Sequence, residues 1–344
     1  MRGWRGALLH LGVLLAVASL AGNASAAAAP RQPVAWPILT SRPPDMPVLD
    51  GYSDTVPDIV GRINGPQALV IFTEGNHYPA LLGGAVLEPF RAWAHADPRF
   101  AELALDNIVV VTLPQPIIVA MIRAGGIGLG NLTIEVSRAA GFYPDLVMAG
   151  IEPLRELRRA GVLEPEALVF ARSDGPALLV RKGNPERVRG LRDLERPSIH
   201  VVLASASEPG ARELYHTALE GLMGARGAAR VLAHETAMFP GRLGIQHRDV
   251  LDALAADYAE VGIIARHLAL YYARTFPDLV EMLPIPGAER YGATIALARV
   301  ADPTHARAAD AFAAYFLGVA DRLYPRYGFA TMAAEEYARR VGLD

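Results

Sequence analysis

The chain has 344 residues, a net charge of −3 at neutral pH and no cysteine. The lack of cysteine excludes disulfides and thiolate catalysis, and the small negative charge gives no indication of nucleic-acid binding. The length is enough for two domains, and the 52% of hydrophobic residues supports a sizeable core.

The first 26 residues have the features of a secretory signal peptide. Arg2 and Arg5 precede an apolar segment, and a small-residue cleavage site ends at Ala26. The apolar segment is shorter than the roughly 20 residues that a membrane-spanning helix needs. We therefore expect residues 1–26 to be removed and the mature protein to be soluble in the periplasm. Residues 27–66, which are rich in proline, are expected to form an extended leader.

Regular structure is expected from Ala68. The apolar run ALVIF predicts a buried strand, TEGNHYP a loop, and residues 80–95 a helix. The same order follows in NIVVVT, LPQP and a helix that ends at Gly125-Gly126. GNLTI and PDLVMAG are predicted to be further short strands. Strands that alternate with helices indicate βαβ units.

The second half continues in the same way. ALLVRKGN follows a polar turn, and the strand IHVVLA ends in SASEPG before a helix over residues 211–224. HRDVLDALAADYA is predicted to be helical, EVGIIA to be a strand, and RHLALYYAR to be a helix. YGATIALARV is a second long β segment, and the chain ends in helices.

Three of these strands end in a polar loop that leads into a helix: IF-TEGNHYP, VVVT-LPQP and HVVLA-SASEPG. Ligands of open α/β sheets bind beyond the carboxyl ends of the strands. Helix N-termini supply unpaired N–H groups and a partial positive charge there, which suits an anion. The loops therefore predict one crevice that binds a small polar solute.

With its segments in this order, the sequence resembles the type II periplasmic solute-binding proteins of ABC importers, in the branch of the molybdate-binding proteins. The segments that carry the resemblance are VVVTLPQPIIVAMIRAGG with PDLVMAG, ALLVRKGNP with LRDL, HVVLASASEPGARELYHTALEGL, and HRDVLDAL with AEVGIIARHLA and the late RYGF. They cover most of the chain after Ala68.

The resemblance implies an α/β, two-lobed fold with two mixed sheets, flanking helices and a hinge of two crossing segments. Lobe 1 would be discontinuous, with residues 67–170 and 285–344, and lobe 2 would hold residues 171–284. The crossings would be ALLVRKGN and the region of residues 285–297. The solute would bind between the lobes.

The resemblance also implies which loops hold the solute, by position along the chain. They are residues 73–78, 112–115, 205–208 and 265–267. This chain departs from the molybdate pattern, because Glu74, His77 and Gln115 stand where hydroxyl residues are expected. With other candidates near the predicted strand ends, the expected ligand-binding residues are Thr73, Glu74, Gly75, Asn76, His77, Gln115, Asn131, Ser205, Ser207, Arg248, Arg266 and His267.

Each candidate also has a plainer interpretation. Thr73 and the serines could cap helices without contacting a solute, and Asn131 could belong to a turn. Glu74 would repel an anion unless it were protonated or paired with arginine. An arginine such as Arg266 suits bidentate anion recognition, although most arginines are solvated.

The hypothesis is a periplasmic receptor, not an enzyme, that delivers a small anionic solute to a membrane ABC permease. The solute would be a molybdate-like oxyanion or a small organic anion, and the protein would be a monomer without cofactor or resident metal. Two alternatives remain open: a receptor for a metal or metal complex that uses His77, Glu74 and His267, and an exported hydrolase with Glu74 and His77 as an acid–base pair. The sequence lacks the GxSxG and HExxH motifs.

Overall fold

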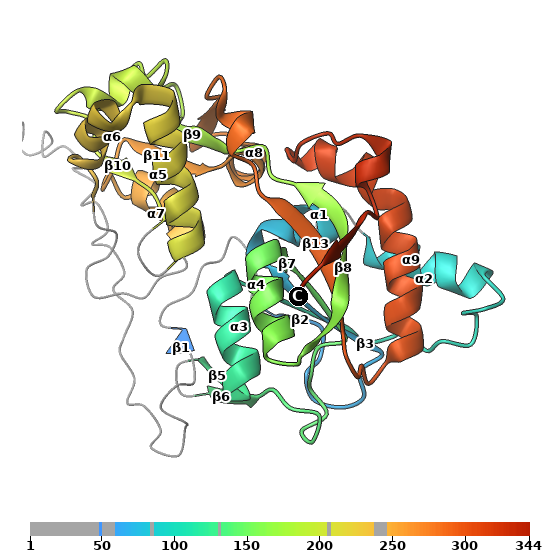
Figure 1. The fold of residues 1–344 in the computed structure, drawn as a ribbon. Coiled ribbons are helices and arrows are strands. Elements are labelled where there is room, and N and C mark those ends of the chain that lie inside the picture. Colours follow the sequence, from blue (N-terminus) through green and yellow to red (C-terminus); the bar gives the residue numbers. More distant parts are fainter. Residues whose placement is uncertain (1–47, 50–58, 83–85, 130–131, 205–207, 237–245) are drawn as a thin grey trace, which may run out of the picture. The chain divides into compact units, whose positions relative to one another are not determined.

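The computed structural model describes residues 48–49, 59–82, 86–129, 132–204, 208–236 and 246–344 (Figure 1). The expected signal peptide and most of the expected leader lie outside these residues, as do Asn131, Ser205 and Ser207. The described chain forms an α/β structure with a seven-stranded sheet, a four-stranded sheet and a small three-stranded sheet. None of its helices is long and apolar enough to cross a membrane.

The seven-stranded sheet has the order β14-β8-β13-β7-β3-β4-β2. Its three central neighbours β7, β3 and β4 run parallel, and the remaining pairs are antiparallel. All six residues of β4 are buried, as expected of a strand covered on both faces. The strands are β2 (Ile59–Val60), β3 (Leu69–Glu74), β4 (Ile108–Leu113), β7 (Leu146–Gly150), β8 (Leu163–Arg172), β13 (Thr294–Val300) and β14 (Arg340–Gly342).

Helices cover both faces of this sheet (Figure 1). On one face lie α3 (Gln115–Ala124) and α4 (Ile151–Arg159), and on the other lie α1 (Tyr78–Leu81), α2 (Leu87–Ala96) and α9 (Ala306–Leu323). The predicted end of α3 is confirmed, since Gly125 closes it in the left-handed conformation at φ 73°. Short 3-10 turns are η1 (Gly75–His77), η4 (Tyr324–Tyr327) and η5 (Ala334–Glu336).

The four-stranded sheet has the order β10-β11-β9-β12, with β10 and β11 parallel and β9 antiparallel to its two neighbours. Helices α5 and α6 pack on one face, and α7 and α8 on the other. The strands are β9 (Pro176–Arg181), β10 (Val201–Val202), β11 (Val261–Ala265) and β12 (Val280–Leu283). The helices are α5 (Pro209–Met223), α6 (Ala225–Leu232), α7 (Gln246–Ala255) and α8 (Arg266–Thr275), with 3-10 turns η2 (Leu191–Glu195) and η3 (Ala288–Tyr291).

The third sheet is small and joins β1 (Val48–Leu49) to the hairpin of β5 (Gly126–Leu129) and β6 (Leu132–Glu135). The strand predicted in GNLTI corresponds to β6, which begins at Leu132. Ile127 and Ile134 contribute to the core beneath α3.

The chain passes twice between the two larger sheets, over residues 173–175 and residues 284–293. The first crossing therefore precedes ALLVRKGN, and the prediction that placed the crossing in that segment was wrong. Its residues 177–181 belong to β9, because they pair with both β11 and β12. The second crossing lies within the predicted region, residues 285–297, apart from its first residue.

The structure also differs from the prediction of a single helix over residues 80–95. Two described helices occupy the segment, α1 ending at Leu81 and α2 beginning at Leu87. α2 packs on the sheet through Phe90 and Ala94, which lie four residues apart and so share one face of the helix.

Candidate functional site

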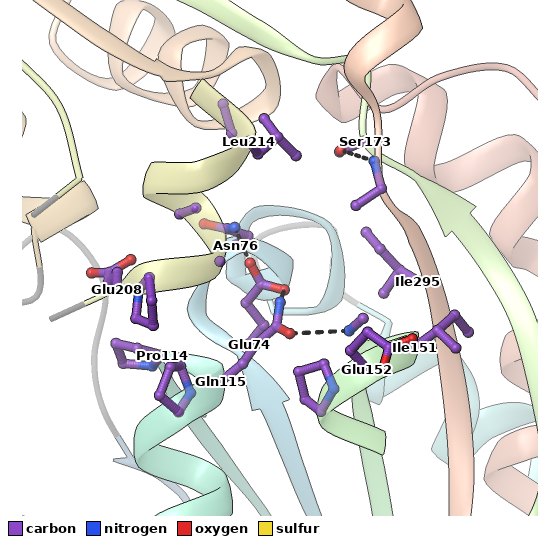
Figure 2. Close-up of a pocket in the computed structure, with 18 of the residues that line it drawn as sticks. Glu74, Asn76, Pro114, Gln115, Ile151, Glu152, Ser173, Glu208, Leu214 and Ile295 are labelled. Atoms are coloured by element: carbon purple, nitrogen blue, oxygen red, sulfur yellow. Dashed lines mark hydrogen bonds between the residues drawn. The ribbon is translucent and has the colours of Figure 1, made fainter. Parts of the chain in front are cut away.

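A cavity of about 680 Å³ lies at the ends of strands from both larger sheets (Figure 2). Its walls mix apolar side chains with carboxylates, amides, hydroxyls, an arginine and a histidine. The lining residues include Glu74, Gly75, Asn76, Pro114, Gln115, Val119, Gly150, Ile151, Glu152, Pro153, Glu156, Arg159, Ser173, Glu208, Pro209, Leu214, Tyr215, Ala265, His267, Leu268, Ala293 and Ile295.

Parallel pairing explains how residues distant in sequence meet at this cavity. β3 pairs with β4 and with β7 in the same direction, so the carboxyl ends of all three strands reach one edge of the sheet. Glu74 ends β3, Gln115 follows β4, and Gly150 ends β7. The structure thus brings together Glu74, Gly75, Asn76, Gln115 and His267 of the sequence-predicted residues.

Four helices present their first turns to the cavity: α3, α4, α5 and α8. Lining residues from these turns include Gln115, Ile151, Pro209 and His267. The corresponding N-cap residues are Pro114, Gly150, Glu208 and Ala265, and none of their side chains makes a capping hydrogen bond. The positive ends of four helix dipoles therefore face one cavity.

The two crossings meet at the cavity wall. Ser173 N donates to Ala293 O at 2.9 Å, and Ala293 N donates to Ser173 Oγ at 2.8 Å (Figure 2). Because Ser173 Oγ accepts from the backbone, the hydroxyl proton of this lining residue can be directed to another acceptor. The wall thus offers a hydrogen-bond donor on a segment fixed by backbone contacts.

Carboxylates contribute negative charge to the same cavity. Glu74, Glu152, Glu156 and Glu208 line it together with Arg159. Tyr215 accepts a hydrogen bond from Ala265 N at 2.8 Å. Burial raises the pKa of Tyr215 well above 10, and the charge of Glu208 raises it further. The phenol is therefore neutral and holds the start of α8 in place.

Two predicted residues at the end of β3 do not line the cavity. Thr73 is fully buried, and its hydroxyl lies 3.4 Å from Glu74 O. His77 is also fully buried, packed against Phe170, Tyr324 and Phe329. Burial lowers the pKa of His77 to about 3, so its ring is neutral at physiological pH.

The predicted arginines are placed differently. Arg266 is not among the cavity-lining residues, because its guanidinium Nη1 is bound to Asp174 Oδ2 at 2.6 Å. Arg248 belongs to α7, but its side chain lies outside the described part of the structure. Within the described residues, no group of three or more His, Asp or Glu side chains is arranged to hold a metal ion.

The residues that α4 and the two crossings contribute to the cavity were not among those predicted from the sequence. Gly150, Ile151 and Glu152 line the cavity, as do Ser173 and Ala293. The signal for the first group was available, because PDLVMAG was predicted to be a strand and IEPLRELRR has the pattern of a helix. No local pattern marks Ser173 or Ala293, since only their long-range pairing brings them to the site.

Comparison with known proteins agrees with this architecture. The family model described as bacterial extracellular solute-binding protein matches residues 92–330, and no curated protein sequence matches the chain. Similar solved structures include the sulfate-binding protein SubI from Mycobacterium tuberculosis H37Rv, with a TM-score of 0.54, 19% identity, and coverage of 79% of this chain and 89% of that one.

Two further structures have the same fold. Peb3 from Campylobacter jejuni, in its L-phospholactate-bound structure, has a TM-score of 0.52 and 14% identity over 77% of this chain and all of that one. Iron-bound HitA from Pseudomonas aeruginosa has a TM-score of 0.50 and 14% identity over 80% of this chain and 89% of that one. The predicted two-lobed fold is confirmed, and the chain belongs to the family of bacterial extracellular solute-binding proteins, which are binding proteins and not enzymes.

Proposed function

We propose that the protein is a periplasmic receptor that binds a small organic anion in the cavity at Glu74, Gln115 and Ser173 and delivers it to a membrane ABC importer. The observation that carries this proposal is the convergence of four helix N-termini, those of α3, α4, α5 and α8, on one cavity. The signal peptide, the periplasmic location and the monomeric state remain parts of the proposal.

The charge of the solute follows from the helices. First-turn N–H groups and the aligned peptide dipoles favour a carboxylate or phosphate, typically by 0.3–1 kcal/mol for each helix terminus. The hydroxyl of Ser173 adds a donor on the wall formed by the crossings. Closure of the proposed lobes would also separate an anionic group at these termini from water, which strengthens the attraction.

The size and lining of the cavity favour an organic anion over a bare oxyanion such as molybdate. A volume of about 680 Å³ is in the range of sites for organic ligands. Val119, Ile151, Leu214, Leu268 and Ile295 supply apolar contacts that a tetrahedral oxyanion could not use. Glu74 and Glu208 would repel a small anion that filled the space between them.

The division of the strands between the two larger sheets supports the proposed lobes. Residues 67–170 and 285–344 contain β3, β4, β7, nearly all of β8, β13 and β14, and residues 171–284 contain the whole four-stranded sheet. The lobes would close on the solute about the two crossings, as hinged binding proteins do.

The metal-receptor alternative is less well supported. It requires His77 as a ligand, but His77 is buried away from the cavity and packs among aromatic rings. SubI is named as a sulfate-binding protein and HitA as iron-bound. Identities of 19% and 14% do not transfer these ligands to this chain, so sulfate and iron are included only as test compounds.

The proposal is tested by thermal unfolding of the mature protein in the presence of single solutes. The panel comprises sulfate, molybdate, phospholactate, mono- and dicarboxylates, hydroxy acids, amino acids, putrescine and ferric citrate. A solute at 100 times its Kd should stabilise the protein by about 2.7 kcal/mol. We expect an organic anion to give the largest rise in Tm.

A cavity-filling variant supplies the control. Leu214→Trp adds bulk to a lining position and should abolish the rise in Tm, whereas Leu317→Trp, on α9 and away from the cavity, should preserve it. A larger response to putrescine than to any anion would contradict the proposal, as would a large response to ferric citrate that citrate alone does not give. An undiminished response in Leu214→Trp would also contradict it.

A further inference from the structure

The wall that α4 contributes to the cavity extends along about two turns of the helix. Glu152, Glu156 and Arg159 line the cavity, and their spacing of four and three residues places them on one face of α4. α3 packs beside α4 (Figure 1) and lines the cavity with Gln115 and Val119, which are also four residues apart. The lined surface therefore continues beyond the first turns of both helices.

The two glutamates of this wall are paired with arginines that do not line the cavity. Arg155 Nη1 binds Glu152 Oε1 at 2.6 Å, and Arg123 Nη1 binds Glu156 Oε1 at 2.8 Å. Each ion pair has a net charge of zero. The negative charges that α4 brings to the cavity are therefore offset by positive charges outside it.

Arg159 differs from the other two arginines of α4. Arg155 is bound to Glu152, and Arg158 Nε is bound to Asp344 Oδ1 at 2.7 Å. Arg159 makes no side-chain ion pair or hydrogen bond within the described part of the chain, and among the described lining residues it is the only Lys or Arg. A guanidinium carries five donors in a planar fork that fits a carboxylate or phosphate. The α4 wall thus presents one uncompensated positive charge to the cavity.

Arg159 and the first turn of α4 lie at different ends of this wall. Eight residue steps separate Ile151 from Arg159, which is about 12 Å along the helix axis. A carboxylate held by first-turn amides, at hydrogen-bond distances of about 3 Å, therefore lies about two helical turns from the backbone of Arg159. A solute that uses both ends of the wall needs two anionic groups.

We propose that Arg159 binds a second anionic group of the solute and so selects organic dianions over monoanions. This inference rests on the proposed function, in which the first anionic group lies at the helix N-termini. The solute class is then an elongated organic dianion with a carboxylate or phosphate at each end. Val119 of α3 and Ile151 of α4 supply apolar contacts for its carbon chain.

The test compares linear acids that differ in one terminal carboxylate. Succinate is paired with butyrate, adipate with hexanoate, and suberate with octanoate, by calorimetric titration of the mature wild-type protein. We expect adipate or suberate to bind about 5-fold or more tightly than its partner. A 5-fold change corresponds to about 1 kcal/mol, the upper range for an exposed ion pair. The succinate pair should show a smaller preference, because its two charges are closer together.

A neutral substitution tests the charge of Arg159 directly. Arg159→Gln should reduce the preference for the dianion to less than about 2-fold and leave the affinity for the monocarboxylate unchanged. Arg226→Gln is the matched control, because Arg226 is an exposed arginine of α6 that does not line the cavity, and it should leave the preference unchanged. Because both arginines are exposed, both variants should keep the wild-type Tm.

Three results would overturn the inference and leave the receptor standing. They are a tightest-binding solute with only one anionic group, a dianion preference confined to the succinate pair, and a preference that persists in Arg159→Gln. Failure of the wild-type protein to bind any anion of this series or of the thermal-unfolding panel would instead contradict the proposed function, and this inference would fall with it.

Discussion

His77 shows how strongly tertiary packing can change one residue. It follows a strand end in a polar loop, yet its ring is fully buried against Phe170 and nearly parallel to Phe329, with centroids 5.6 Å apart. Phe329 in turn stacks on His267, with centroids 4.1 Å apart. Burial lowers the pKa of His77 from 6.5 to about 3, because the charged ring would lose its hydration.

This shift makes a prediction about pH. Between pH 6.5 and 3 the unfolded state binds a proton at His77 and the folded state does not, so the free energy of unfolding falls as the pH is lowered. Relative to a His77→Phe variant, which cannot titrate, the wild-type protein should lose about 2–3 kcal/mol between pH 7 and pH 4.5.

Urea unfolding at a series of pH values measures this difference. A difference between wild-type and His77→Phe that is constant with pH would show that His77 is solvated or charged in the folded protein.

At the scale of elements, Asp145 connects the sheet to α9. This fully buried carboxylate stands just before β7 and accepts from Val70 N and His305 N, both at 2.8 Å. Its Oδ2 also lies 2.9 Å from His305 Nδ1. His305 is the N-cap of α9 and makes no side-chain capping bond, so Asp145 satisfies a backbone donor at the start of that helix.

We expect Asp145→Asn to lower the free energy of unfolding by about 3 kcal/mol, because the new NH2 group would face a backbone donor in a buried site. Asp310→Asn is the matched control, since Asp310 is largely exposed and pairs with Arg299 at 3.0 Å. The control should change the stability by less than 1 kcal/mol. Equal losses in the two variants, measured by urea unfolding, would rule out a special role for Asp145.

At the scale of the whole molecule, the two crossings depend on glycine. A Cβ at Gly292 would lie 1.9 Å from Ser173 O, and one at Gly175, where φ is +69°, would lie 2.0 Å from Ala288 O. The backbones of residues 173–175 and 284–293 therefore pack directly against each other. Ser173 and Ala293 in this contact also line the cavity.

Gly292→Ala should consequently force the crossings apart, with a loss of about 1–3 kcal/mol in the free energy of unfolding and a lower affinity for the solute. Gly318→Ala, in α9 where a Cβ meets nothing within 4 Å, should instead stabilise the protein by about 0.5–1 kcal/mol. Urea unfolding and calorimetric titration of the two variants provide the comparison. Wild-type stability and affinity in Gly292→Ala would show that the crossings do not need this close contact.

The sequence by itself determined the alternation of strands and helices, since buried strands such as β3 and β4 are continuous apolar runs followed by polar loops. It also indicated that Glu74, Asn76 and Gln115 would meet, because parallel strands end at one edge. Only the tertiary structure decided that Thr73 and His77 turn into the core, that Arg266 binds Asp174, and that α4, Ser173 and Ala293 complete the cavity. These features depend on long-range pairing and on the direction of individual side chains, neither of which local periodicity encodes.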